Sequence, residues 1–329
     1  MTSTKNIQRC QTISVVIPVF TGEATLKGVV DELINTFNSR TGEFELKLEE
    51  IVLVHDGGQD RSDDVMRRLS IDYPIVRNVW LARNYGQHPA TLAGMACSRG
   101  DWVVTMDEDG QHNPKDVFAL LECALRSRAD LVYAKPRKIP AHGFVRNFAS
   151  RLTKRAVLPL LLGRRVQYFS SFRLILGEAA RSLAAYASND VYLDVALSWV
   201  CQQAESVLVD FRNEGRAGSG YSFKALNSHL LRLILSSGTR PLRLASLVGV
   251  TAFILGLMFA VVVVFRKVLF GFEVVGWASL FSLVLVIGGL ILLVLGVIAE
   301  YVGLLVRSAT GRPLYVIAND REAGPLSRN

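Results

Sequence analysis

Oxygen-bearing side chains recur at every second position of the segment Asp107-Glu108-Asp109-Gly110-Gln111. The segment follows an apolar run at 102–106, and in an extended chain alternate residues point the same way. Asp107, Asp109 and Gln111 are therefore expected to face one site. Carboxylate and amide oxygens suit Mg²⁺ or Mn²⁺, hard cations that complete their coordination with substrate phosphates and water. The segment predicts a metal site, with a solvated acidic turn as the alternative.

A further carboxylate, Asp56, comes two residues after the apolar run at 51–54 and precedes Gly57 and Gly58. A carboxylate accepts hydrogen bonds from the ring N–H of uracil or guanine, and glycines allow a ligand to approach the backbone closely. A helix N-cap or a turn aspartate is the alternative. No glycine-rich dinucleotide motif or P-loop motif follows a predicted strand, which disfavours those two kinds of nucleotide site.

These acidic residues lie where predicted strands end. Short β-rich runs are found at 13–20, 51–54, 76–81, 102–106 and 131–134. They alternate with stretches of helical period at 26–37, 65–69, 89–98 and 114–127. This alternation predicts an α/β fold, a doubly wound and mainly parallel sheet with helices on both faces. Such sheets bind ligands beyond the carboxyl ends of their strands.

Two runs near the C-terminus, at 244–265 and 274–299, are nearly free of charge. Each is long enough to cross a bilayer as a helix, which takes roughly 20 apolar residues. Two buried helices of a soluble core are the alternative, but such helices normally carry a polar stripe. We therefore expect a catalytic domain at 1–221, an amphipathic interfacial helix at 222–243, a two-helix transmembrane anchor within 244–299, and a cytosolic tail at 300–329.

The distribution of charge indicates the orientation in the membrane. The formal net charge is +8, and basic residues flank the two runs on their outer sides, at Arg232, Arg240, Arg243, Arg307 and Arg312. Under the positive-inside rule, both termini and the domain at 1–221 are expected to be cytoplasmic in a multi-pass protein of the plasma membrane. Lipid headgroups and a phosphorylated lipid explain the basic clusters better than nucleic acid does. The four cysteines lack metal spacing and are expected to be reduced.

Several motifs together resemble glycosyltransferase family 2. Residues 15–20 and 51–58 resemble the family's V-V-I-P-V-Y strand and V-D-D-G-S turn, and 81–111 resemble its L-x-R-N-x-G…A-G…G-D…M-D-x-D-x-Q stretch. Further matches are an internal S-x-F-R-L at 171–174, a G-x-S-x-Y region at 218–222, and the bacterial ending at 299–303 and 312–315. The best match is the polyprenyl-phosphate sugar transferase branch, which includes dolichol-phosphate mannose synthase and GtrB- and ArnC-like enzymes.

The chain departs from the family pattern at two turns. His55 and Gly58 replace the first aspartate and the serine of the D-D-G-S turn, which leaves Asp56 to contact the base. Thr21-Gly22 stands where the family usually has Asn-Glu, so a nucleotide contact passes to Glu23 or is lost.

The resemblance implies the GT-A fold and a role for each matching residue. The nucleotide would be bound by Pro18, Phe20, Glu23, Asp56 and Asp107. The metal ligands would be Asp107, Asp109 and Gln111. The acceptor phosphate would be guided by Arg137, Arg173 and Ser219, with a solvated charge as the alternative for Arg137. The residues implied in catalysis are Asp107, Asp109, Arg137 and Arg173.

The implied reaction is a metal-dependent, inverting transfer of a hexose-type sugar from a nucleotide diphosphate sugar, with UDP favoured, to a polyprenyl phosphate such as undecaprenyl phosphate. The acceptor phosphate is mostly dianionic at pH 7, so the reaction requires no general base. Two spans alone offer little packing, and the resemblance implies a homo-oligomer, a tetramer. The alternatives are a processive polysaccharide synthase, whose Q-x-x-R-W motif is absent from the sequence, and a non-catalytic membrane scaffold.

Overall fold

The computed structural model describes residues 10–40, 45–137, 169–187, 192–212, 276–311, 313–320 and 322–323, with separate positions between 249 and 269. The chain divides into two compact units. One consists of Met1–Tyr221 together with Pro313–Asn329, and the other is Ser222–Arg312. The segment Pro313–Asn329, which is part of the expected cytosolic tail at 300–329, thus groups with the first unit.

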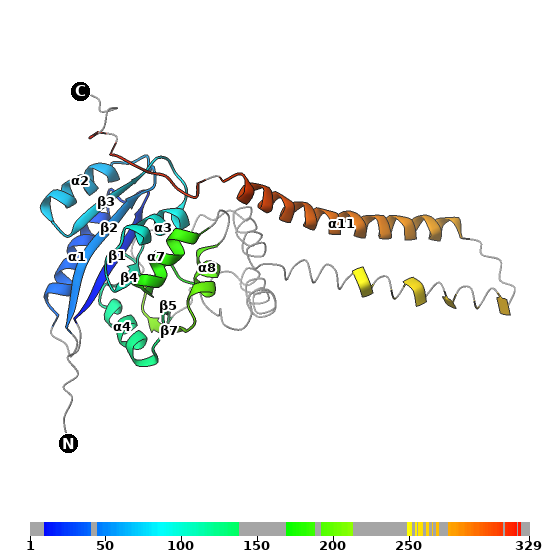
Figure 1. Cartoon of the computed structure of the whole chain (residues 1–329), viewed down its shortest axis with the longest axis horizontal. Helices are drawn as coiled ribbons and strands as arrows, with labels where there is room; N and C mark the ends of the chain where they lie inside the picture. Colours follow the sequence, from blue (N-terminus) through cyan, green and yellow to red (C-terminus); the bar gives the residue numbers. More distant parts are fainter. Residues whose placement is uncertain are drawn as a thin grey trace, which may run out of the picture. The chain divides into compact units, whose positions relative to one another are not determined.

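The first unit is built on a mixed, mainly parallel sheet. Its described strands are β1 (Gln11–Val19), β2 (Leu46–His55), β3 (Val76–Leu81), β4 (Trp102–Thr105), β5 (Leu131–Pro136), β6 (Arg173–Leu176), β7 (Ala204–Val209) and β8 (Ile317–Ala318). They lie in the order β7-β5-β6-β4-β1-β2-β3-β8 (Figure 1). Strand β1 pairs in parallel with β2 and β4, and β2 with β3. The carboxyl ends of these four strands therefore meet at one edge of the sheet, as predicted.

Helices cover both faces of the sheet because side chains alternate along its buried strands. The described helices of this unit are α1 (Leu26–Asn38), α2 (Ser62–Asp72), α3 (Gln87–Cys97), α4 (Asp116–Ser127), α7 (Gly177–Tyr186) and α8 (Leu193–Val200). On β1, Val15 and Ile17 belong to the core formed with α1, α2 and α4, whereas Val16 belongs to the core formed with α3, α7 and α8 (Figure 1). The doubly wound architecture follows from this alternation.

The elements predicted between residues 13 and 134 are confirmed, whereas the later strands and helices of the first unit were not predicted. Strand β6 lies between β4 and β5 and is antiparallel to both. Strand β8 is antiparallel to β3 and forms the outer edge of the sheet. Each of these strands is short, so neither shows enough side-chain alternation to be recognised in the sequence.

The second unit contains a long apolar helix, α11 (Trp277–Ala309), of 33 residues. At about 1.5 Å per residue it is roughly 50 Å long, more than a bilayer core requires. Its segment Val286–Gly303 has a mean hydropathy of 2.3 and is not buried within the structure. The helix continues past the predicted end at 299 and stops before Gly311, whose φ of +64° is the left-handed conformation that ends many helices.

The other predicted span, 244–265, is described only in part. A shorter apolar helix, Gly249–Met258, lies within it. The predicted interfacial helix at 222–243 lies outside the described residues. Within the part of the chain that the structure describes, one helix is therefore long and apolar enough to cross a membrane, where the sequence predicts two.

A buried ion pair and its hydrogen bonds join four elements of the first unit. Arg173 on β6 pairs with Asp194 on α8, and the two side chains are 3% and 4% exposed. The hydroxyl of Tyr133 on β5 donates to Asp194 Oδ1 at 3.0 Å, and Arg173 Nε donates to Thr105 Oγ1 on β4 at 3.1 Å. Burial raises the pKa of Asp194, while Arg173 and Tyr133 act in the opposite direction. The buried charges thus have partners on neighbouring elements.

Asp194→Ala is expected to lower the free energy of unfolding by about 3–5 kcal/mol, because it leaves the Arg173 guanidinium buried without its counter-ion. Denaturant unfolding of the full chain in detergent measures this. The double variant Arg173→Met, Asp194→Leu should recover most of the loss, since it removes both charges. Glu49→Ala, which breaks an exposed pair with Lys47, is the control and should cost less than about 1 kcal/mol. A small effect of Asp194→Ala would contradict the proposed importance of this pair.

Candidate active site

Asp107 follows β4 at the carboxyl edge of the sheet, and side chains hold both of its carboxylate oxygens. Gln87 Nε2 donates to Oδ1 at 2.6 Å, and Ser171 Oγ donates to Oδ2 at 2.6 Å. The backbone N–H of Asp107 donates to Nδ1 of His112 at 3.1 Å, and the His112 ring stacks on Phe172. Burial lowers the pKa of His112, which favours the neutral ring needed to accept this bond. Asp107 is therefore fixed in orientation by several partners.

Asp109 lies in the turn between Asp107 and α4. Its Oδ1 accepts the N–H of Gln111 at 3.1 Å, and the carbonyl of Gln111 accepts the N–H of Arg212 at 3.0 Å. The Arg212 guanidinium donates to both oxygens of Glu32 on α1, at 2.7 and 2.6 Å. The segment is thus a turn and not the extended chain assumed from the sequence. The alternation argument that placed Gln111 beside the two aspartates consequently does not apply.

The oxygen donors at this edge fit a hard divalent cation. Each carboxylate oxygen has two lone pairs, so the bonds from Gln87 and Ser171 leave both oxygens of Asp107 able to bind a metal, and they fix its direction. The Asp107 side chain is 27% exposed, which gives a ligand access. A second acidic group consists of Asp63, Asp64 and Glu322. Each of these carboxylates already forms an ion pair with Arg67.

Asp56 has a role that the sequence did not reveal. It is 3% exposed, and its Oδ1 and Oδ2 accept the N–H groups of Tyr85 and Gly86 at 2.7 and 2.8 Å. Burial raises the pKa of Asp56, and these two N–H groups oppose the increase. The carboxylate that was predicted to contact the base thus anchors the loop after β3, the loop that leads to Gln87.

The loop after β1 carries the other residues predicted to contact the nucleotide. Pro18 is partly buried near the end of the strand, and Phe20 is 43% exposed. Glu23 is exposed, and its Oε2 accepts the N–H of Arg61 at 3.2 Å. Gly58 approaches this loop so closely that a Cβ at position 58 would lie 2.0 Å from the carbonyl oxygen of Phe20. The loops after β1 and β2 are therefore in direct backbone contact.

The three residues predicted to guide the acceptor phosphate differ in what the structure shows of their positions. Arg137 directly follows β5 and is 61% exposed, with its Nε 3.7 Å from Asp210 Oδ2. Since β5 is antiparallel to β6, and β6 to β4, Arg137 lies at the same edge of the sheet as Asp107. Arg173 is buried against Asp194, so it supports the sheet and does not reach a ligand, contrary to the expected catalytic role. Ser219 lies outside the described residues.

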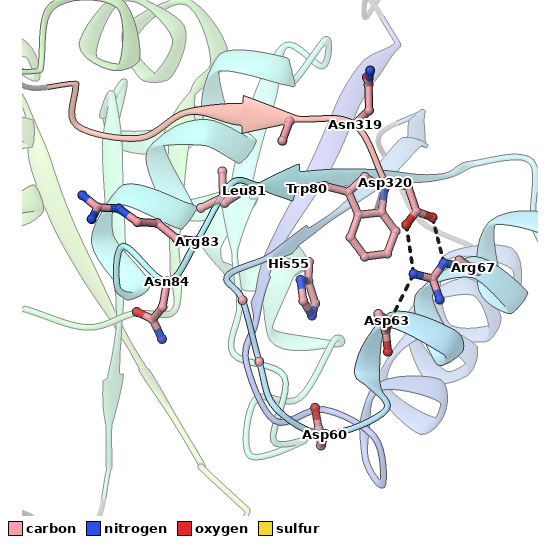
Figure 2. A pocket seen from close by; sticks show the side chains of 13 residues that line it. His55, Asp60, Asp63, Arg67, Trp80, Leu81, Arg83, Asn84, Asn319 and Asp320 are labelled. Atoms are coloured by element: carbon pink, nitrogen blue, oxygen red, sulfur yellow. Dashed lines mark hydrogen bonds and ion pairs between the residues drawn. The ribbon is translucent and has the colours of Figure 1, made fainter. Parts of the chain in front are cut away.

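A cavity of about 380 Å³ opens beside these loops (Figure 2). Residues from the ends of β2 and β3, the start of α2 and the segment after β8 line it. His55 and Trp80 have ring centroids 5.2 Å apart, and burial lowers the pKa of His55. Next to Trp80, whose ring centroid is 5.2 Å from Arg67 Cζ, Arg67 binds both oxygens of Asp320, at 2.7 and 2.9 Å (Figure 2). The C-terminal residues thus form part of a cavity at the carboxyl edge.

Sequence reasoning missed the residues that orient the aspartates. Gln87, Ser171 and His112 contact Asp107, and Glu108 contacts the loop after β1. Ser171 and Gln87 did lie within family-like motifs, and that was the available signal. Their bonds to Asp107 span 64 and 20 positions of the sequence, so local patterns could not reveal them.

The comparison with protein families agrees with this geometry. Residues 14–186, from β1 to the end of α7, match the model of glycosyl transferase family 2. The match covers more than half of the chain. This chain belongs to glycosyl transferase family 2. It is accordingly a glycosyltransferase, and its carboxyl-edge loops carry the candidate catalytic residues.

Two relatives of this family 2 glycosyltransferase align by sequence along nearly its whole length, and a solved structure aligns along 70% of it. Glucosyl-3-phosphoglycerate synthase from Mycobacterium tuberculosis superposes with a TM-score of 0.47 at 21% identity, covering 70% of this chain and 80% of that one. The bactoprenol glucosyl transferase of Shigella phage SfV is 29% identical over 94% of this chain and 99% of its own. The undecaprenyl-phosphate 4-deoxy-4-formamido-L-arabinose transferase of Pseudomonas paraeruginosa is 30% identical over 95% of this chain and 91% of its own. The last two similarities extend through the C-terminal unit.

Gly58→Ala is expected to lower the free energy of unfolding by about 1–3 kcal/mol, because the new Cβ would overlap the carbonyl of Phe20 and separate the two loops. Gly28→Ala on α1 is the matched control, since its Cβ would meet nothing within 4 Å, and it should be neutral or stabilising by up to about 1 kcal/mol. Denaturant unfolding of both variants tests this. Equal stabilities would show that the contact between the loops has room for a methyl group.

Proposed function

We propose that this family 2 glycosyltransferase moves a hexose-type sugar from a nucleoside diphosphate to a polyprenyl phosphate at the cytoplasmic face of a membrane. One observation carries the proposal. Two full-length relatives whose names specify different sugars, glucose and 4-deoxy-4-formamido-L-arabinose, both name a polyprenyl carrier as the acceptor. The shared acceptor supports the same lipid class here, while the divergent sugars leave the donor to be determined. UDP remains the favoured nucleotide.

The carboxyl edge of the sheet supplies the groups that this chemistry needs. Asp107 and Asp109 would hold Mg²⁺ or Mn²⁺, with Gln111 as a further candidate, and a cation bound there neutralises charge on the departing nucleoside diphosphate. Gln87 and Ser171 keep Asp107 oriented in advance, so little reorganisation is needed when the donor binds. Phe20 offers an exposed aromatic face to the nucleoside at the same edge.

The acceptor phosphate needs a positively charged group to position it more than it needs a base to remove a proton. A phosphate monoester is mostly dianionic at pH 7, so its oxygen can attack the anomeric carbon in line, with inversion. Arg137 is exposed at this edge, and its guanidinium suits a phosphate that arrives from the membrane. Arg173 is not assigned to this task because it is buried with Asp194.

The membrane supplies the acceptor and, in this proposal, the anchor. Helix α11 has the length and hydropathy of a transmembrane span, and Gly249–Met258 would belong to a second one. Two spans return the chain to the side from which it came, and the basic residues that flank the spans favour the cytoplasm as that side. The pairing of β8 with β3 supports this topology, since it puts residues from before and after the spans in one sheet.

The donor and the acceptor are identified by incubating the purified full chain with a panel of nucleotide sugars and short polyprenyl phosphates. Mass spectrometry then detects the polyprenyl-phosphate sugar and the released nucleoside diphosphate. The proposal expects one donor to give both products only when Mg²⁺ or Mn²⁺ is present. Transfer to a soluble acceptor alone, with none to polyprenyl phosphate, would overturn it.

Asp109→Ala is expected to abolish sugar transfer to polyprenyl phosphate while the protein remains folded and in the membrane, because it removes a carboxylate from the metal site. The matched control is Asp72→Ala, which removes an exposed carboxylate at the end of α2 and should retain full activity. Transfer rates and membrane fractionation are measured for both variants. Full activity of Asp109→Ala would refute the metal assignment.

A further inference from the structure

The loop after β1 is held by a carboxylate that belongs to the acidic segment after β4. Glu108 Oε2 accepts the N–H of Phe20 at 2.9 Å, and Glu108 Oε1 accepts the N–H of Thr21 at 3.0 Å. Hydrogen bonds to an ionised carboxylate are stronger than bonds between neutral groups. Two successive backbone N–H groups are thus fixed by one side chain from a distant part of the sequence.

Gly22 makes room for this carboxylate. A Cβ at position 22 would lie 2.8 Å from Glu108 Oε2, and also 3.3 Å from the side chains of Leu26 and Val19. A larger side chain at position 22 is therefore incompatible with Glu108 in its present place. Thr21-Gly22 also stands where the family resemblance leads one to expect Asn-Glu, so this loop has one carboxylate fewer. Glu108 brings a carboxylate to the same loop from outside it.

Other contacts fix the remaining groups of this loop. The N–H of Gly22 donates to Oγ of Ser62 at 2.7 Å, and Gly58 lies against the carbonyl of Phe20. The consecutive backbone N–H groups of residues 20, 21 and 22 therefore all have defined acceptors. Two of these three depend on Glu108. Removing that carboxylate would free the backbone of Phe20, while Asp107 would keep its bonds to Gln87 and Ser171.

We propose that Glu108 is a positioning residue, which holds the nucleoside-side loop after β1 in register with the aspartates that would bind the metal. Its neighbours Asp107 and Asp109 would serve the diphosphate, whereas Glu108 holds the loop that carries Phe20. The role rests on the proposed nucleotide-sugar function, and the contact between Glu108 and Gly22 can be tested without it.

The contact is tested by a double-mutant cycle of Glu108→Ala and Gly22→Ala in the full chain in detergent. Gly22→Ala alone should lower the thermal unfolding midpoint, because its Cβ displaces Glu108. In the Glu108→Ala background the same change should cost clearly less, since the displaced oxygen is absent. Glu178→Ala, an exposed carboxylate on α7, serves as the control and should leave the midpoint unchanged. Strictly additive effects would overturn the contact.

The positioning role is tested by calorimetric binding of UDP and GDP with Mn²⁺. For the nucleotide that binds the wild type, Glu108→Ala should raise the Kd by roughly 10- to 100-fold, because two charge-assisted bonds that order the loop are lost. Glu108→Gln keeps one acceptor oxygen and should give an intermediate Kd. In transfer assays the donor KM should rise more than kcat falls, and the Mn²⁺ concentration for half-maximal activity at saturating donor should stay within about twofold of the wild type.

The possible results separate the two proposals. A Kd that is unchanged in Glu108→Ala, with a wild type that binds nucleotide, would overturn the positioning role and leave the proposed function intact. A large loss of Mn²⁺ affinity would instead make Glu108 a metal ligand and overturn the role in that way. A wild type that binds neither nucleotide would refute the proposed function and this role together, while the double-mutant cycle would still decide whether the contact exists.

Discussion

The parallel pairing of β1 with both β2 and β4 is the constraint on which the candidate site depends. Side chains alternate along a strand, so a slip by one residue would exchange the two buried faces of β1 and displace every loop at the carboxyl edge. Polar contacts fix the register at the opposite end. Asp101 Oδ2 accepts the N–H and the hydroxyl of Thr12, and the Thr12 hydroxyl in turn accepts the N–H of Asp101. The amino end of the sheet therefore holds the carboxyl end in alignment.

The carboxylates at the carboxyl edge divide into those that accept hydrogen bonds from the backbone and those that accept them from side chains. Asp56 and Glu108 each accept two backbone N–H groups, from the loops after β3 and β1 respectively. Asp107 instead receives side-chain donors, Gln87 and Ser171, which fix its direction without closing it off from solvent. One acidic segment of the sequence thus contains carboxylates of both kinds. Only the partner atoms distinguish the two.

The sequence was sufficient for the elements up to residue 134, since their apolar periodicity directly reflects which face is buried. It was insufficient where long-range partners decide the outcome. The family resemblance implied a catalytic role for Arg173, but Asp194, Tyr133 and Thr105 are its partners in the buried interior, and two of these residues lie on other strands. The same applies to Asp56 and Glu108, whose acceptor roles depend on backbone groups about 30 and 88 positions away. Periodicity does not encode such contacts.

The short strand β8 has a consequence for how the first unit can be prepared on its own. A fragment that stops at residue 221 would lose β8 together with the second unit, exposing the backbone of β3 as an open edge that can pair with another chain. It would also deprive Arg67 of Asp320 and remove one wall of the cavity. The second unit is in effect an insertion, with the sequence of the first unit continuing on both sides of it. A fragment that keeps the whole of the first unit should therefore be made by replacing 222–312 with a flexible linker, and not by truncating the chain.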